Sequence, residues 1–266
     1  MMKSIDLNAD IGEGFGDYQI ADDAALMPLI TSANVACGFH AGDAAIMAKT
    51  VALAKQHDVD LGAHVGFPDL MGFGRRRMQI DPDTLAHYVT YQLGALSAFA
   101  HAARYPLTHM SFHGALGNMV SEDEALADVL LRAVKTFDPN MIISTMAGNA
   151  VDRVARRLGL RVVCVFLADR AYESDGLLVS RAKPGAVIHD TEQVKARVRR
   201  LLTEGTIESI KGDTLTLDVS SILVHGDTPE AIEMVKTLRA TIEETGLRIA
   251  PVSEQIRQQS WEHTAL

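Results

Sequence analysis

The sequence is poor in cysteine, tryptophan and other aromatic residues. Its two cysteines, Cys37 and Cys164, lie in apolar, strand-like runs. Thiols in such surroundings indicate reduced core residues of a cytoplasmic protein. No CxxC or Cys–His spacing accompanies them, which argues against a zinc site built on cysteine.

Long apolar runs and excess positive charge are also missing. No stretch of about 18 apolar residues occurs, and the first residues lack the apolar core of a signal peptide, so we expect no membrane span. The chain has 25 Lys+Arg against 34 Asp+Glu, a formal net charge of -9. This balance argues against non-specific binding to nucleic acid or anionic membranes, although a local arginine cluster can still bind an anionic substrate.

What is abundant is aliphatic: 47% of the 266 residues are hydrophobic and only 5% are aromatic. Such a composition suits buried parallel strands covered by helices, and one α/β barrel can take up a chain of this length. Apolar, β-branched runs predict strands at Ile5–Ala9, Ser32–Cys37, Asp60–Ala63, Thr108–Phe112, Met141–Ser144, Arg161–Phe166, Ser221–Val224 and, more weakly, Leu247–Val252.

Amphipathic stretches alternate with these strands. They predict helices at Asp43–Gln56, Asp81–Ala103, Ser121–Phe137, Gly148–Leu158, Thr191–Thr203 and Pro229–Thr245. Ser121 begins a capping-box pattern, Thr228 precedes a proline at the first helical position, and Gly159 and Gly246 fit helix ends. Strict alternation implies a parallel sheet with right-handed crossovers, and seven or eight such units favour closure into an α/β barrel.

No linker or change in composition marks a second domain. The segment Ile207–Asp218, with Gly212 and Asp213 between two alternating runs, predicts a β-hairpin. We therefore expect one barrel domain over residues 1–252 with a hairpin insertion near 206–218, followed by a C-terminal tail at 253–266.

Polar residues gather where the predicted strands end, and catalytic groups of parallel barrels occupy the loops after the carboxyl ends of the strands. Four histidines lie at such ends, beside or near glycines: His40, His64, His113 and His225. Singly, each could cap a strand or bond a neighbouring carbonyl, but together they predict a shared polar pocket. The other six fit solvated histidines: His57, His87, His101, His109, His189 and His263.

The first strand adds carboxylates to this pocket, because Asp6, Asn8 and Asp10 alternate and so share one face. An ionised carboxylate inside a barrel needs an arginine, a protonated histidine or a metal. Asp10 with His40 and His64 is therefore a candidate site for a divalent metal, and the same groups could act as general acid and base.

Arginines follow the third strand in the run Gly72–Arg77. Forked guanidinium groups there suit a carboxylate or phosphate, whereas the alternative is a solvated basic turn. No Gly-x-Ser-x-Gly motif occurs, and neither cysteine lies beside a candidate histidine, which argues against a nucleophilic triad.

Six segments together resemble the LamB/YcsF family: IDLNADIGEGFG, SANVACGFHAGD, GAHVGFPDLMGFGRR, HGALGN, ADRAYESDGLLVSR and VHGDTPEA. The resemblance covers about Ile5 to Ile249. It implies a seven-stranded (β/α) TIM-like barrel of the glycoside hydrolase/deacetylase type. It also implies ATP-dependent hydrolysis of the cyclic amide 5-oxoproline to L-glutamate, together with partner subunits B and C.

With this chemistry in view, we assign the candidate residues to two roles. The predicted catalytic residues are Asp10, His40, His64, His113 and Asp169. The predicted substrate-binding residues are Asn8, Glu13, Arg75, Arg76, Arg170, His225 and Asp227.

Departures from the family pattern open alternatives. The usual Lys-Pro-His-Gly-Ala-Leu-Tyr-Asn has Ser111 for its Lys and Gly117 for its Tyr, the usual His-Pro-Gly has Val65, and a usual Glu is Val165. Loss of Lys and Glu together fits loss of one buried ion pair. The chain could then be a paralogue for another lactam, a stand-alone metal-dependent amidohydrolase or deacetylase, or a non-catalytic binding subunit.

Overall fold

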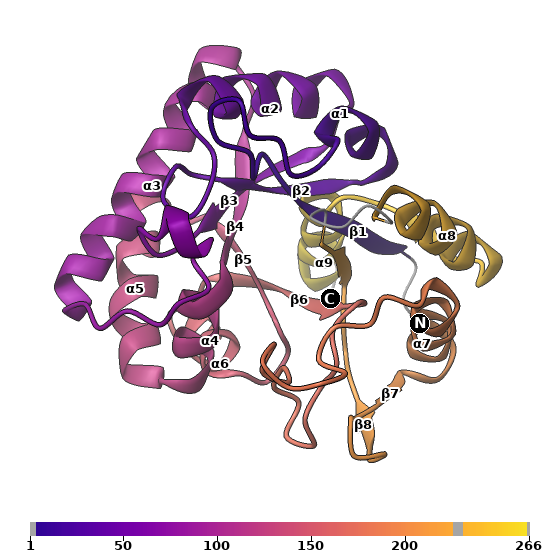
Figure 1. Cartoon of the computed structure of the whole chain (residues 1–266). Helices are drawn as coiled ribbons and strands as arrows, with labels where there is room; N and C mark the ends of the chain where they lie inside the picture. Colours follow the sequence, from indigo (N-terminus) through magenta and orange to yellow (C-terminus); the bar gives the residue numbers. More distant parts are fainter. Residues whose placement is uncertain (1–3, 226–230, 265–266) are drawn as a thin grey trace.

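The computed structural model describes residues 4–225 and 231–264, with side chains up to residue 258. Its centre is a closed barrel of seven parallel strands, as the sequence predicts (Figure 1). The strands follow one another around the ring in the order β1 (Ser4–Ile11), β2 (Ser32–Ala36), β3 (Asp60–Val65), β4 (Leu107–Phe112), β5 (Ile142–Thr145), β6 (Arg161–Leu167) and β9 (Ser221–Val224).

The ring closes where β9 pairs with β1, with Asp6 opposite Ser221 and Asn8 opposite Leu223. Alternation along β1 sends its polar residues into the lumen, while Leu7 and Ala9 are fully buried on the outer face. The predicted eighth run contributes only β10 (Arg248–Ile249), which pairs with the start of β1 outside the ring.

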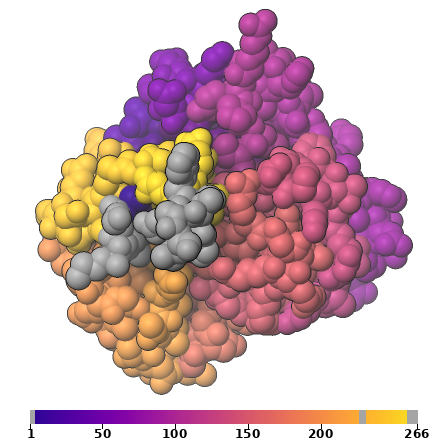
Figure 2. Space-filling model, turned by 180° about the vertical axis from the view of Figure 1, so that it is seen from behind, coloured from indigo at the N-terminus to yellow at the C-terminus, as the bar shows by residue number. Residues whose placement is uncertain are grey.

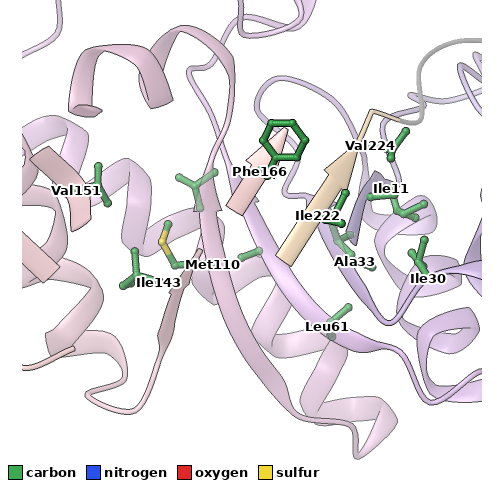
Figure 3. Close-up of a cluster of buried hydrophobic side chains, with 14 of the residues drawn as sticks. Ile11, Ile30, Ala33, Leu61, Met110, Ile143, Val151, Phe166, Ile222 and Val224 are labelled. Carbon is green, nitrogen blue, oxygen red and sulfur yellow. The ribbon is translucent and has the colours of Figure 1, made fainter. Parts of the chain in front are cut away.

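Helices surround the barrel and bury its outer face (Figure 1). After the short α1 (Asp23–Leu26) and η1 (Met27–Leu29), they are α2 (Ala44–Gln56), η2 (Leu70–Gly72), α3 (Pro82–Ala103), α4 (Gly114–Glu122), α5 (Glu124–Phe137), α6 (Ala150–Arg157), α7 (Thr191–Glu204) and α8 (Ala231–Glu244). Figure 3 shows part of the core between strands and helices, with Met110, Ile143 and Phe166 among its buried side chains. No helix in the described ranges is both long and apolar enough to cross a membrane.

One predicted helix, Ser121–Phe137, is wrong at its start. The chain instead forms two helices, α4 and α5, and Ser121 lies inside α4. The cap is Asp123, whose carboxylate accepts hydrogen bonds from the backbone N–H groups of Ala125 (2.8 Å) and Leu126 (3.1 Å). Asp123 is extended, as an N-cap requires, and its acidic side chain also suits the positive end of α5. The predicted cap at Thr228 lies outside the described residues.

The segments around the C-terminal third complete the fold. β7 (Thr206–Glu208) and β8 (Thr214–Thr216) form an antiparallel hairpin within the segment where the sequence suggests one. Residues that the sequence analysis set apart as a tail form α9 (Val252–Thr264). Val252 and Ile256 pack on Ile142 and Val163 near the starts of β5 and β6. The helix therefore closes the end of the barrel away from the carboxyl ends of the strands, and Figure 2 shows this yellow segment bordered by the magenta middle of the chain.

Candidate active site

A pocket of about 460 Å³ opens at the carboxyl ends of the barrel strands. It brings together residues from elements that are far apart in the sequence, because parallel strands place their carboxyl ends at one rim. Of the predicted site residues, those lining it are Asp10, His64, Arg75, His113, Arg170 and His225.

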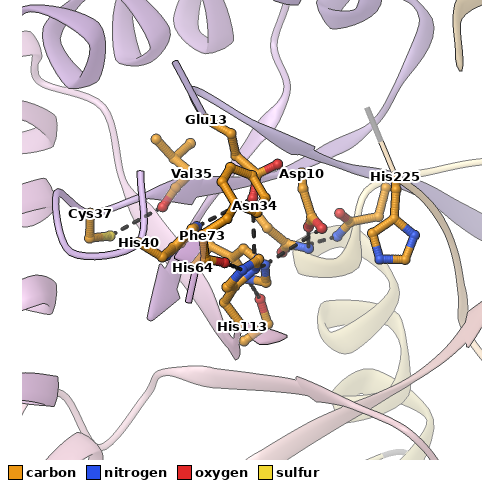
Figure 4. A network of polar contacts seen from close by, with 12 residues as sticks. Asp10, Glu13, Asn34, Val35, Cys37, His40, His64, Phe73, His113 and His225 are labelled. Atoms are coloured by element: carbon orange, nitrogen blue, oxygen red, sulfur yellow. Dashed lines mark hydrogen bonds and ion pairs between the residues drawn. The ribbon is translucent and has the colours of Figure 1, made fainter. Parts of the chain in front are cut away.

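A buried cluster of one carboxylate and three imidazoles lies against this pocket: Glu13, His40, His64 and His113. One ligand atom of each residue lies within 4.8 Å of all the others. His40 Nε2 is 3.3 Å from Glu13 Oε1, and His113 Nδ1 is 2.9 Å from His64 Nε2 (Figure 4). The rings of His40 and His113 are stacked, with centroids 3.7 Å apart.

Two glycines allow this dense packing of rings. A Cβ at Gly66 would lie 2.7 Å from His40 Nδ1, and one at Gly74 would lie 2.7 Å from His40 Cβ and 2.8 Å from His113 Cδ2. Gly74 also has a φ of +63°, in the left-handed region that other residues rarely adopt. The glycines near the predicted histidines thus admit the backbone close to the imidazole stack.

The hydrogen bonds fix where the protons of the cluster lie. His113 Nε2 donates to the carbonyl oxygen of Phe73 at 2.8 Å, so His113 Nδ1 bears a lone pair when the ring is neutral. His64 Nε2 then donates to it, and His64 Nδ1 accepts from the hydroxyl of Ser111 at 2.7 Å. Burial lowers the pKa of His64 to about 3 and holds the pKa of His40 and His113 well below the usual range. These imidazoles are therefore neutral near pH 7.

Neutral imidazoles and a carboxylate are the donor set that a divalent cation such as Zn²⁺ prefers. Tetrahedral ligands at about 2.0–2.1 Å lie roughly 3.3 Å from one another. The Glu13–His40 and His113–His64 separations of 3.3 and 2.9 Å and the 3.7 Å from His113 Nδ1 to Glu13 Oε1 bracket that spacing. His40 Nδ1 is buried without a hydrogen-bond partner. The cluster could hold a metal ion.

This set differs from the predicted metal ligands in its carboxylate. Asp10 lies beside the cluster, with Oδ2 3.5 Å from His64 Nε2. Its Oδ1 accepts a hydrogen bond from Asn34 Nδ2 at 3.0 Å. Glu13, which the sequence analysis assigned to substrate binding, lies within the cluster instead. Glu13 lies in the loop that follows β1, and its carboxylate extends from this loop to His40.

Across the pocket, His225 Nδ1 donates to the carboxylate of Asp169, 2.8 and 2.9 Å from its two oxygens. Burial by itself would raise the pKa of Asp169 and lower the pKa of His225. The opposite charges outweigh burial, so the pKa of Asp169 falls below and that of His225 rises above its ordinary value. This histidine differs from those of the cluster in favouring its protonated form.

The arginines are distributed differently from the sequence expectation. Arg75 lines the pocket, with its guanidinium 4.8 Å from the centre of the Phe73 ring. Arg76 does not line it, and its guanidinium binds the carboxylate of Asp69 at the surface. Arg181, which the sequence analysis did not select, lines the pocket from the loop after β6. A signal was available, because Arg181 ends the segment ADRAYESDGLLVSR that carries part of the family resemblance.

Arg170 lines the pocket but is engaged with backbone. Its Nε donates to the carbonyl of Ala186 at 3.1 Å, and one terminal nitrogen donates to the carbonyl of Val179 at 2.6 Å. Burial lowers its pKa to about 10, so the group stays charged near neutral pH. These contacts hold the loop after β6 in place, so Arg170 has a structural role in addition to any contact with substrate.

Sequence reasoning misplaced one histidine. His109 was expected to be solvated, yet it is fully buried in the lumen, where its Nε2 lies 3.2 Å from Asn34 Oδ1. The signal was available, because His109 and Ser111 alternate along β4, directly before His113, and so share its inner face. Asn8 contacts the same Asn34 oxygen at 3.4 Å, deeper than the pocket lining. Asp227 lies outside the described residues.

Comparison with known proteins agrees with this architecture. The model of the LamB/YcsF family matches residues 5–257. A protein of Ralstonia nicotianae named as the second 5-oxoprolinase A subunit is 59% identical over 95% of this chain and 97% of its own length, and the 5-oxoprolinase A subunit of Pyrococcus horikoshii is 47% identical over 95% and 99%. The crystal structure of a lactam utilization protein from Thermus thermophilus has a TM-score of 0.87 and 40% identity, covering 93% of this chain and 99% of that one. The chain therefore belongs to the LamB/YcsF family.

Proposed function

We propose that this chain is the A subunit of an ATP-dependent 5-oxoprolinase, which opens the lactam of 5-oxoproline to give L-glutamate. The names of its full-length relatives support this function. The observation that carries it in the structure is a proton donor and a carboxylate that line one pocket. His225, paired with Asp169, favours its protonated form, and Asp10 lies on the wall of the same pocket.

Lactam opening uses both kinds of group. The ring nitrogen must leave as an amine and needs a proton, which His225 can donate while Asp169 holds its ring in position. Water must lose a proton as it adds to the carbonyl carbon, and the carboxylate of Asp10, which lines the pocket, can take it. The substrate carboxylate is matched by the guanidinium groups of Arg75 and Arg181 on the pocket wall.

ATP enters the proposal because an amide is a poor electrophile. Transfer of the terminal phosphoryl group of ATP to the amide oxygen, with release of ADP, would make the carbon susceptible to water. Departure of the ring nitrogen as an amine would then leave an acyl phosphate, which a second water would hydrolyse to glutamate and phosphate. We assign this step to the complex with partner subunits B and C. The relatives are named as A subunits, which supports an assembly of this kind.

The cluster of Glu13, His40, His64 and His113 supports a second candidate, a stand-alone metal-dependent amidohydrolase or deacetylase. A divalent ion held there would act as a Lewis acid and lower the pKa of bound water. The two candidates differ in what they need. Purified chain that hydrolyses an amide with a stoichiometric metal and without ATP or partners would establish the second and exclude the first.

The deciding assay is release of glutamate from 5-oxoproline, with and without ATP and with and without the partner subunits. We expect release only when ATP and all subunits are present. Asp169→Ala should reduce the rate at least about 100-fold because the proton donor loses its partner. His87→Ala, on the exposed face of α3, should not. Full activity of the Asp169 variant in the complex would instead indicate a non-catalytic binding subunit.

A further inference from the structure

The pocket reaches from the rim into one side of the barrel. Its inner wall there, which we name the lumen sector, consists of Ser111, Ser144, Val165, Leu167 and Leu223. These residues come from β4, β5, β6 and β9, which are consecutive around the ring. Val165 is in register with Ser221, which in turn is opposite Asp6. The lining therefore runs along four neighbouring strands of the barrel wall, next to the histidine cluster.

The other side of the lumen is filled. There Asn34 contacts both His109 and Asn8 across the barrel. Lumens of parallel barrels are usually packed by layers of large side chains. The lumen sector departs from that rule because its residues line an open pocket.

The dimensions and chemistry of the pocket exceed what 5-oxoproline needs. Its volume of about 460 Å³ falls in the range of sites for drug-sized ligands, roughly 300–1,000 Å³. 5-Oxoproline is a single five-membered ring with one carboxylate. If its amide lies at His64 and His113 and its carboxylate at Arg75 and Arg181, its hydrocarbon edge turns toward the lumen sector and leaves that space unfilled.

We propose that the lumen sector is a subsite for a neutral, mainly apolar substituent on the lactam, so that this chain takes 5-oxoproline-type cyclic amides with a substituted ring. The proposal rests on the proposed function and names its substrate class. No member of the sector is charged, and burying a phosphate or ammonium group there without a partner would be costly. An alkyl or phenyl group would instead be bound by Val165, Leu167 and Leu223.

Two measurements test this subsite. Calorimetry on the full chain would compare 5-oxoproline with analogues that carry methyl, propyl or benzyl groups at either ring methylene. Turnover of the same compounds would be measured in the complex with ATP. Burial predicts that Kd falls about fourfold for each methylene added, for the analogue series whose substituent points into the sector.

Two substitutions of Val165, one that fills the lumen sector and one that does not, serve as test and control. Val165→Phe fills the sector and should remove the gain from substituents, measured against the Kd of the same variant for 5-oxoproline. Val165→Thr keeps the side-chain shape and should retain most of the gain. Thermal unfolding checks that each variant is folded, and Val165→Leu replaces the Phe variant if that one is not.

The outcomes separate this proposal from the function on which it rests. Analogues that bind no better than 5-oxoproline at either position, or a gain that survives in Val165→Phe, would overturn the subsite. Turnover of 5-oxoproline with every analogue rejected would overturn the subsite and leave the proposed function standing. Binding that follows the series, with no turnover of any lactam in the complex, would support the subsite and overturn the function.

Discussion

Asp6, at the closed end of the lumen, should make the protein less stable as pH rises toward 7. The carboxylate is fully buried, and it accepts hydrogen bonds from the hydroxyls of Thr31 (2.8 Å), Ser32 (2.7 Å) and Ser221 (2.5 Å). Burial nevertheless raises its pKa from 3.8 to about 7. The folded protein therefore binds this proton more tightly than the unfolded chain does.

The sign and size follow from linkage. Between pH 3.8 and about 7 the unfolded chain has lost the proton that the folded protein keeps, so unfolding becomes easier as pH rises. Each unit of pKa difference is about 1.4 kcal/mol, which gives a total of about 4 kcal/mol above pH 7. Asp6→Asn removes the titration while keeping the shape, and serine and threonine hydroxyls can accept from its amide as well as donate. The variant should gain about 3 kcal/mol relative to the wild type between pH 5 and 8.

Urea unfolding followed by circular dichroism at pH 5, 6, 7 and 8 measures this difference. Comparing two proteins at each pH cancels the titration of every other group. Asp83→Asn, at the exposed first turn of α3, controls for the loss of a negative charge alone. Wild-type and Asp6→Asn free energies that stay parallel across the range would refute the reasoning, because they would mean that Asp6 titrates equally in both states.

Three further predictions concern the pocket and the lumen. If His225 is the proton donor, kcat should be retained at low pH and should fall as pH rises through the raised pKa of His225. In Asp169→Asn this fall should occur at lower pH. An unchanged pH profile would argue against the pairing. Gly62→Ala should lower the free energy of unfolding by about 1–3 kcal/mol in urea titrations, because the new Cβ would lie 2.1 Å from His109 Nε2. An unchanged urea midpoint would mean that the imidazole of His109 has room to move. Elemental analysis after incubation with Zn²⁺ should find about one ion per chain and none in His113→Ala, with equal content in both arguing against the cluster as the site.

The barrel was predictable because short apolar runs alternate with longer amphipathic stretches along the chain. Runs such as Arg161–Phe166 are short and apolar, and the helices between them are long enough to cross from one strand to the next. Where local signals overlapped, the prediction failed. A capping motif at Ser121 and a second one at Asp123 compete, and only packing of α4 against the barrel shows that the latter begins α5.

The site was predictable as a set of strand ends but not as a set of contacts. Strand ends identify His64 and His113, because every parallel strand delivers its last residues to the same rim. They cannot tell that Glu13 reaches the cluster while Asp10 bonds Asn34, since loop conformation and rotamers decide this. For the same reason Arg76, two residues from Gly74, turns away from the pocket.

Closure of the ring by β1 and β9 has a consequence for when the site comes into being. Asp10 lies on β1 and His225 directly follows β9, more than two hundred residues later in the chain, yet both line one pocket. Contacts between residues so far apart in the chain form late, because the loop-closure entropy is lost before these contacts can stabilise the fold. A nascent chain that ends before Ser221 lacks both β9 and His225. During synthesis, catalytic competence would therefore appear in a single late step, when the last strand of the barrel docks on the first.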